Sequence, residues 1–502
     1  MAKTETTYPI SRATKKGVVG HLAVAATVLI LMMAFGIIML FNQGGLITIS
    51  PDLFYSIMTV HGIGMVGMAS LGGAAIMWYF LCKYVPLNPK VLMTNLVLSV
   101  IGIAMILIAA FVFKFSDAWT FLYPLPSVSA KQHGMAGAMF FLNGVLFVGV
   151  GFLIMYLEIG RKIAKQYGGL MNGLGWDMLF GKSDKHYGPP AAVVASTMVV
   201  ICNSTAILAG ATVIIMSIIN ILNPSIVFDA LLAKHLTYAF GHIFANATIY
   251  MAVVGVYEIL AKYADRPWKA NKVFLIAWNF STLFTLMIYT HHLLMDFAVP
   301  KWMLLIGQIF SYANGLPVMV VTAYGALMIV YRSGLRWDMA SGLMFLAMFG
   351  WVGGAVPAII DATIVVNHVM HNTKWVPGHF HIYMGLGVTI MIIAFMYYYN
   401  KVEGNRRDHS WDRISAAFYT VFFLGLTGSF LYAGKISAPR RWAVHLPEWM
   451  LSDIVGGISA CFVLAATISF TLRFFANVKY TRTANTTEEM VHDTTSLMKK
   501  SS

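Results

Sequence analysis

The sequence predicts an all-α, polytopic membrane protein with about twelve transmembrane helices. Hydrophobic residues make up 59% of the 502 residues, and charged residues make up only 11%. The chain also contains about twelve apolar runs, each long enough for a bilayer that takes ~20 helical residues to cross. This composition excludes a soluble multidomain protein.

The apolar runs follow one another with short polar connections and without an internal repeat. They define an N-terminal segment at 1–19, a twelve-helix membrane domain at 20–476 and a polar tail at 477–502. The predicted helices lie near 20–42, 53–82, 92–114, 132–158, 190–222, 233–261, 273–295, 302–331, 341–366, 376–399, 414–436 and 450–476.

Lysine and arginine gather in alternate loops, which indicates how the chain crosses the membrane. Arg12, Lys15 and Lys16 belong to the cation-rich set, as do Arg406 and Arg407. By the positive-inside rule, these loops and both termini face the cytoplasm, in the inner (plasma) membrane of a prokaryote. The net charge of +14 is explained by these loops, so no nucleic-acid partner is expected.

The cysteines exclude two kinds of cofactor site on this chain. Cys82, Cys202 and Cys461 are far apart, and the sequence has no CxxCH haem-attachment motif and no paired-cysteine copper motif. We therefore expect neither covalently attached haem nor a cysteine-held copper centre.

Six histidines fall within four of the predicted helices, at a similar depth in the outer half of the bilayer. Ionisable residues inside a membrane are costly and usually functional, whereas histidines that only pack would scatter in depth. The common level predicts a shared set of metal centres. The six are His61, His242, His291, His292, His379 and His381.

The stretch HNTKWVPGHFH at 371–381 organises this set. Residues two apart on a helix point about 200° apart, so His379 and His381 offer imidazoles in two directions. With His61 opposite, His381 completes the two axial ligands of a low-spin haem, whereas His379 holds a second haem on one side only. The alternative is two polar residues near a membrane interface.

The remaining histidines suit a further metal opposite the open haem position. His242, His291 and His292 offer three imidazoles, which favours copper over iron. In the loop SAPRRWAVH, Arg440 and Arg441 suit haem propionates through charge-assisted hydrogen bonds, and His371 lies at the same level. Cations that reach to the membrane interface are the alternative for the two arginines.

These residues resemble the catalytic subunit I of the haem–copper oxidase superfamily, and HNTKWVPGHFH is most similar to its B-type branch. The resemblance covers essentially the whole chain. It implies low-spin haem ligation by His61 and His381, high-spin haem ligation by His379, and a second metal at His242, His291 and His292. It also implies electron delivery from the outer side, by a subunit with dinuclear copper or haem c and a soluble donor such as cytochrome c.

The sequence departs from the oxidase pattern at one position. In A- and B-type oxidases, the first histidine of the sixth helix is followed four residues later by a cross-linked tyrosine, and here that position is Asn246. C-type oxidases carry the tyrosine six residues before the histidine pair, where this chain has Thr285. Asn246 shares a helix face with His242 and offers an amide oxygen to the second metal. The alternative is a polar packing residue.

The missing tyrosine indicates a change of substrate. Splitting dioxygen takes four electrons, one of which the tyrosine supplies, whereas two nitric oxide molecules take two. We therefore expect reduction of nitric oxide to nitrous oxide. The alternatives are dioxygen reduction to water with Tyr250 or Tyr289 as substitute, and a haem-bearing sensor without turnover.

A polar stripe continues inward from His242 and predicts a proton path from the cytoplasm. Tyr250, Tyr257 and Glu258 lie on the sixth predicted helix. Such a stripe is expensive against lipid and should face the bundle interior. Ser311 and Thr322 on the eighth helix are predicted partners, and an interfacial tyrosine belt is the alternative at Tyr257.

Overall fold

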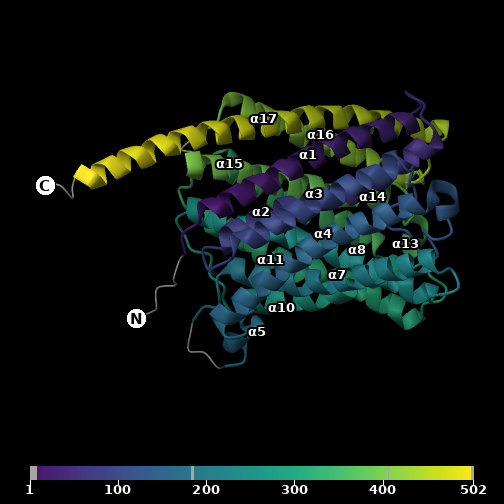
Figure 1. Cartoon of the computed structure of the whole chain (residues 1–502), viewed down its shortest axis with the longest axis horizontal. Helices are drawn as coiled ribbons and strands as arrows, with labels where there is room; N and C mark the ends of the chain where they lie inside the picture. The colour runs from purple at the N-terminus through teal and green to yellow at the C-terminus, as the bar shows by residue number, and fades with distance from the viewer. Residues whose placement is uncertain (1–7, 182–185, 405, 499–502) are drawn as a thin grey trace.

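A bundle of long, roughly parallel helices forms the molecule, and its first helix begins at the end of the bundle where its last helix ends (Figure 1). The structure is a computed structural model that describes residues 8–181, 186–404 and 406–498. Within these ranges, twelve helical segments are long and apolar enough to cross a membrane, which confirms the predicted fold class.

The helical elements follow one another without a sheet in the described ranges. In chain order they are α1 (Arg12–Gln43), α2 (Pro51–Leu81), α3 (Pro89–Phe111), α4 (Ala130–Tyr167), α5 (Leu170–Gly173), α6 (Trp176–Leu179), α7 (Ala191–Leu222), α8 (Ala230–Gly255), η1 (Val256–Leu260), α9 (Ala261–Tyr263), α10 (Lys272–Met287), η2 (Ile288–Leu293), α11 (Lys301–Val330), α12 (Met339–Asp361), α13 (Ile364–Met370), α14 (Trp375–His381), η3 (Ile382–Thr389), α15 (Ile390–Gly404), α16 (Ser410–Lys435) and α17 (Pro447–Met498).

The first and last helices are longer than their apolar runs. Helix α1 begins at Arg12 rather than near 20, because the Ser11 side chain caps it by accepting from the Thr14 amide at 3.1 Å. Helix α17 runs to Met498, through most of the predicted tail 477–502. Residues 499–502 of that tail lie outside the described ranges, as do residues 1–7 of the predicted segment 1–19.

Three of the predicted helices contain irregular turns. The sixth span changes from α8 to a π-helical turn, η1, at Val256–Leu260, and the tenth changes from α14 to a π-helical stretch, η3, at Ile382–Thr389. The seventh ends as a 3₁₀ helix, η2, at Ile288–Leu293, which carries the adjacent histidines. Such turns shift the register of the residues beyond them, so positions counted along an ideal α-helix no longer share a face.

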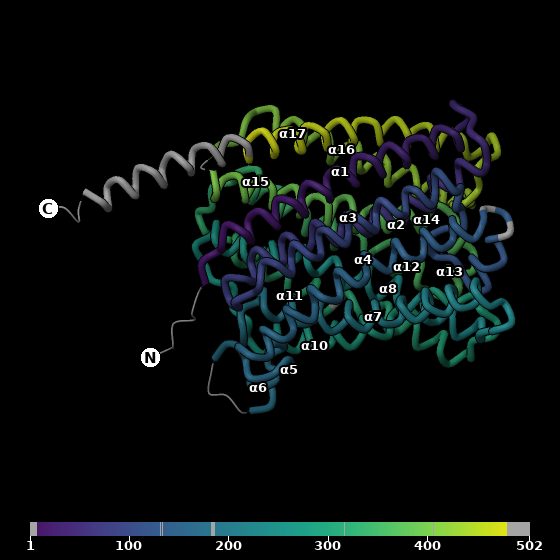
Figure 2. Tube along the Cα trace, in the orientation of Figure 1, coloured from purple at the N-terminus to yellow at the C-terminus, as the bar shows by residue number. Residues whose placement is uncertain are grey.

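The helices that carry most of the histidines are the central ones. In the most apolar windows of α2, the α8 span and the α14–α15 span, 67%, 83% and 72% of residues are buried. The corresponding share is 33% for α3 and 24% for α11. Helices α1, α16 and α17 pack together along one side of the bundle (Figure 2). The central helices are thus shielded from lipid by the others.

A short antiparallel contact positions the loop that carries the two arginines. Thr373 and Pro439 form an isolated β-bridge. The Lys374 amide donates to Ala438 O at 2.9 Å, and the Arg440 amide donates to Asn372 O at 3.0 Å. The loop after α16 is therefore fixed against the residues that begin α14.

Close packing of α16 against the start of α14 generates a test. A Cβ added at Gly434 would lie 2.3 Å from the Trp375 backbone nitrogen, which cannot move without shifting α14. We expect Gly434→Ala to destabilise the protein by about 1–3 kcal/mol, as overpacking does. The measurement is the midpoint of thermal unfolding in detergent. Gly428→Ala on the same helix is the control, because nothing lies within 4 Å of its added Cβ; equal midpoints for the two variants would contradict this packing.

Candidate haem and metal centre

Two imidazoles from α2 and α14 face each other across a narrow gap. The ring centroids of His61 and His381 are 6.3 Å apart, and the rings are inclined by 18°. His61 Nδ1 donates to Met32 O at 2.7 Å, and His381 Nδ1 donates to Pro377 O at 2.6 Å. Because a carbonyl only accepts, each Nδ1 carries the proton, which leaves each Nε2 free to bind a metal.

Three further imidazoles form a compact group on α8 and η2. The ring nitrogens of His242, His291 and His292 that could bind a metal all lie within 4.8 Å of one another. His242 Nδ1 and His292 Nε2 are 2.8 Å apart, and His291 Nδ1 is 2.9 Å from Ser311 Oγ. The group contains three histidines and no carboxylate. Three neutral nitrogens suit copper or zinc more than they suit a hard cation.

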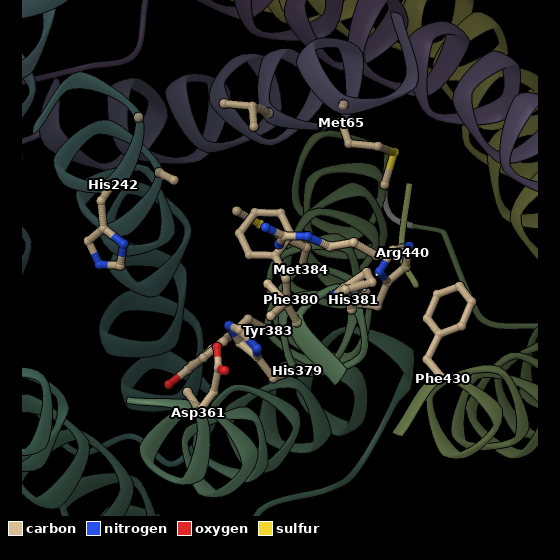
Figure 3. Close-up of a pocket in the computed structure, with 18 of the residues that line it drawn as sticks. Met65, His242, Asp361, His379, Phe380, His381, Tyr383, Met384, Phe430 and Arg440 are labelled. Atoms are coloured by element: carbon tan, nitrogen blue, oxygen red, sulfur yellow. Dashed lines mark hydrogen bonds between the residues drawn. The ribbon is translucent and has the colours of Figure 1, made fainter. Parts of the chain in front are cut away.

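His379 stands apart from both groups. It is buried beside the backbone of Trp375, one turn earlier on the helix, and its ring lies 6.4 Å from the ring of Tyr383. Figure 3 shows His379 and His381 leaving the same helix in different directions, with His242 across the pocket.

All six histidines line one cavity of about 490 Å³. Its volume lies in the range of ligand and cofactor sites, and its wall is largely apolar with a few polar groups. The structure thus brings together the six histidines that the sequence singled out. Their individual ligand roles stay predictions.

The loop between α16 and α17, which we call the arginine loop, places positive charge at one end of the cavity. Arg440 and Arg441 both line it, and the buried Nε of Arg440 has no hydrogen-bond partner. Burial and the neighbouring Arg441 lower the pKa of Arg440 to about 10, partly offset by Tyr238 and Asp361. Burial, Arg440 and Arg441 lower the pKa of His371 to about 4, so this imidazole is neutral at pH 7.

The arginines and the histidines of the cavity together suit two haems. A buried guanidinium without its full set of acceptors is unfavourable unless an anion pairs with it. Haem propionates are anions that would lie at this end of the cavity, within reach of Arg440 and Arg441. The donor set therefore accommodates one haem between His61 and His381, another at His379, and a metal at the three-histidine group.

Asn246 lies on the cavity wall one turn beyond His242, as its spacing predicted. Its Nδ2 donates to Thr285 Oγ1 at 3.4 Å, and Thr285 in turn donates to Asn314 Oδ1 at 2.9 Å. Thr285 therefore contacts the amide nitrogen of Asn246. The position that holds tyrosine in A- and B-type oxidases is thus occupied by a neutral amide.

The predicted proton-path residues have separate hydrogen-bond partners. Tyr257 and Thr322 share a hydrogen bond of 2.6 Å, and Ser311 contacts His291. Glu258 does not join them, because its carboxylate accepts from Tyr84 at 2.7 Å. Glu258 directly follows Tyr257, and adjacent residues on a helix point about 100° apart, so the two side chains meet different neighbours.

Tyr250 is buried on the same helix and packs on two indole rings. Its ring lies 5.2 Å from that of Trp278 and 6.0 Å from that of Trp351. The ring of Tyr289 packs against that of His235, which is not part of the three-histidine group, with the two ring centroids 6.0 Å apart. Neither tyrosine forms a hydrogen bond with His242 in the described structure.

One aromatic neighbour of the three-histidine group is not among the residues predicted from the sequence. The ring of Tyr238 stacks on His292 at 5.2 Å with an inclination of 13°. Tyr238 lies four residues before His242, so the i, i+4 rule that singled out Asn246 also identifies Tyr238 when applied toward the N-terminus.

Comparison with known proteins gives the family. The family described as "Cytochrome C and Quinol oxidase polypeptide I" matches residues 16–469. The chain belongs to this family. Family membership implies two haems and a binuclear-centre metal in a subunit of a multi-subunit haem–copper oxidase, and the three-histidine group agrees with it.

Individual relatives of this haem–copper family member are distant. A "Cytochrome c oxidase subunit 1" of Thermus thermophilus is 24% identical over 240 residues, which cover 44% of this chain and 42% of that protein. The protein of that name from Synechocystis sp. is 21% identical over 455 residues, covering 85% of this chain and 76% of its own. The chain thus spans about two fifths of the length of the Thermus thermophilus relative.

A solved structure supports the fold. The structure described as a heme-copper terminal oxidase dimer has a TM-score of 0.72, with 21% identity, and covers 94% of this chain and 84% of its own. At this identity the likeness concerns the fold. The relatives are bacterial and archaeal, which agrees with a multi-pass protein of a prokaryotic membrane.

The three-histidine group predicts the effect of removing one imidazole. We expect His242→Ala to lose most of the non-haem metal while both haems stay bound, because their ligands lie elsewhere. The measurement is metal content per chain by mass spectrometry, together with the optical spectrum of the haems. His235→Ala is the control, a histidine of the same helix that contacts Tyr289 outside the group. Full metal content in His242→Ala would contradict the assignment.

Proposed function

We propose that this chain is the catalytic subunit of a respiratory enzyme that reduces nitric oxide to nitrous oxide. The observation that carries the proposal is Asn246 on the cavity wall, one turn beyond His242. In A- and B-type relatives this position supplies a tyrosine to dioxygen chemistry. An amide has no accessible electron to give and does not exchange a proton near pH 7.

Stoichiometry connects this residue to the substrate. Two nitric oxide molecules, two electrons and two protons give one nitrous oxide and one water. One dioxygen molecule needs four electrons and four protons to give two waters. Two haems and one further metal hold the electrons for the first reaction without a redox-active side chain, whereas fast splitting of dioxygen calls for one more electron at the site.

In this proposal, side chains of the subunit hold the two haems and the further metal in place. His61 and His381 hold the low-spin haem, His379 holds the second haem, and the three-histidine group holds copper in preference to iron. When bound, these groups supply electrons and the open coordination positions for the gas. The backbone acceptors of His61 and His381 fix which ring nitrogen is free.

Asn246 and the arginine loop complete the cavity. Thr285 holds the Asn246 amide nitrogen, so the amide oxygen faces the cavity as a hydrogen-bond acceptor or weak metal ligand. Arg440 and Arg441 pair with propionates at the other end. The largely apolar wall excludes water and favours small uncharged gases.

Dioxygen reduction to water is the second candidate function. The names of the curated relatives favour it, since they are called cytochrome c oxidase subunit 1. One feature of the site also favours it, because Tyr238 stacks on His292 and offers a phenol beside the metal group. In this case Tyr238, rather than Tyr250 or Tyr289, takes the place of the missing tyrosine.

We further propose how the enzyme is placed and supplied. Both termini face the cytoplasm, which puts the arginine loop on the outer side of the membrane. A partner subunit with dinuclear copper or haem c delivers electrons there from a soluble donor such as cytochrome c. Protons reach the cavity from the cytoplasm past Tyr257 and Thr322, whose hydroxyls share a hydrogen bond.

Turnover of the purified complex tests the choice of substrate. With a reduced small-molecule donor and no oxygen, we expect rapid loss of nitric oxide with one nitrous oxide formed per two consumed. We expect slow oxygen uptake by the same sample. Fast oxygen uptake with only trace nitrous oxide would establish the second candidate, and no turnover with either gas in a fully loaded complex would favour a sensor.

The hydroxyl pair at Tyr257 predicts a separate kinetic effect. We expect Tyr257→Phe to slow turnover roughly tenfold or more, because it removes a proton-carrying hydroxyl, while the haem spectra stay unchanged. Tyr263→Phe is the control, because this tyrosine of the same span donates to Asp338 instead. Steady-state rates with intact spectra are the measurement, and an unchanged rate in Tyr257→Phe would remove this residue from the path.

A further inference from the structure

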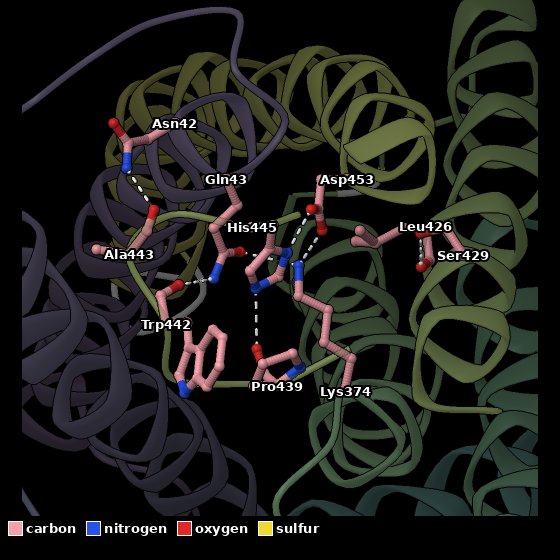
Figure 4. A network of polar contacts seen from close by, with 10 residues as sticks. All are labelled: Asn42, Gln43, Lys374, Leu426, Ser429, Pro439, Trp442, Ala443, His445 and Asp453. Carbon is pink, nitrogen blue, oxygen red and sulfur yellow. Dashed lines mark hydrogen bonds and ion pairs between the residues drawn. The ribbon is translucent and has the colours of Figure 1, made fainter. Parts of the chain in front are cut away.

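A buried ionic cluster lies behind the arginine loop, where α1, α14 and α17 meet (Figure 4). We name it the Lys374 cluster and define it as Lys374, Asp453, His445 and Gln43. The side chains of Lys374, Asp453 and His445 are 3%, 1% and 0% exposed. Charged groups this deeply buried are rare unless they are paired and hydrogen-bonded.

Lys374 is surrounded by three electron-rich groups. Its ammonium contacts Asp453 Oδ1, donates to Gln43 Oε1 at 2.8 Å, and lies 5.4 Å from the centre of the Phe430 ring. Gln43 Nε2 donates to Trp442 O at 2.7 Å, which fixes Gln43 Oε1 as the acceptor. A carboxyl oxygen, an amide oxygen and the face of an aromatic ring all attract a cation, so these contacts favour the ammonium form of Lys374 over the neutral amine.

Asp453 and His445 together are neutral. His445 Nε2 donates to Pro439 O at 2.9 Å, because that carbonyl only accepts. His445 Nδ1 lies 2.6 Å from Asp453 Oδ2, and one proton must sit between these two atoms. Whether the histidine or the carboxyl holds it, the sum of their charges is zero. The cluster as a whole therefore keeps one positive charge, that of Lys374.

This charge lies close to the low-spin haem position. The Phe430 ring that Lys374 contacts is itself 5.0 Å from the ring of His381, so a single aromatic ring separates the ammonium from a haem ligand. Lys374 also lines the cavity, and its backbone holds Ala438 of the arginine loop. Nearby net charge is one of the factors by which a protein sets the potential of a haem.

We propose that Lys374 is a positioning residue whose buried charge raises the reduction potential of the low-spin haem held by His61 and His381. This inference rests on the haem placement under the proposed function and extends it. A fixed cation stabilises the reduced haem, which carries one positive charge less than the oxidised haem. Electrons that arrive at the arginine loop are thereby drawn to this haem first.

Redox titration of the low-spin haem in the complete complex tests the proposal. Lys374→Met should shift the reduction equilibrium about tenfold toward the oxidised haem, which is about 59 mV for one electron. Lys374→Arg keeps the charge and should leave the midpoint nearly unchanged. Lys435→Met is the control, because it removes an exposed cation near the same end of the bundle. A midpoint in Lys374→Met equal to that of the unaltered complex would overturn the proposal.

A second variant covers the case in which Lys374→Met does not assemble. Lys374→Gln with Asp453→Asn removes both charges without leaving either buried alone, and the cluster becomes neutral. We expect the same lowering of the midpoint, and no change would again overturn the proposal. Magnetic circular dichroism of the unaltered complex tests the haem placement separately from the effect of Lys374 on the reduction potential. Absence of a bis-histidine low-spin haem there would refute the haem placement itself.

Discussion

The cost of burying imidazoles inside a membrane bundle is the constraint on which the rest of the structure depends. An uncharged ring in this setting needs a partner for each polar nitrogen. Backbone carbonyls satisfy one nitrogen of His61 and of His381, and Ser311 satisfies one of His291. The nitrogens that remain converge on one cavity. The histidine-bearing helices therefore lie at the centre of the bundle, and the remaining ring nitrogens are available to bind metal.

Charge at the end of the cavity follows from the same constraint. Arg440 is buried with Nε unpaired, and Lys374 lies behind it in a cluster that keeps one positive charge. In the proposed placement of the haems, anionic propionates would balance the charge of Arg440, and Lys374 would act on the low-spin haem across Phe430. The loop thus connects haem binding, electron delivery and redox potential. Asn246 also lines the cavity, and in the proposed function it takes the place of a redox-active phenol without contributing an electron.

Much of this was predictable, because long apolar runs and intramembrane histidines are strong signals. The twelve spans were confirmed, and the six histidines do meet in one cavity. The partners of individual side chains were less predictable. Glu258 accepts a hydrogen bond from Tyr84, which is 174 residues away in the sequence, and no spacing rule shows such a pair. The Lys374 cluster joins residues 43, 374, 445 and 453, and such long-range pairs have no local pattern in the sequence.

Nitric oxide reduction at this site requires that no tyrosine serves as a redox partner of the three-histidine group. Peptide mapping of the purified protein by mass spectrometry examines this point without any assay of turnover. We expect the peptide with His242 to have its unmodified mass, and the peptides with Tyr238, Tyr250 and Tyr289 to be recovered separately. A covalent bond between His242 and any tyrosine would refute the proposed function and establish a dioxygen reductase.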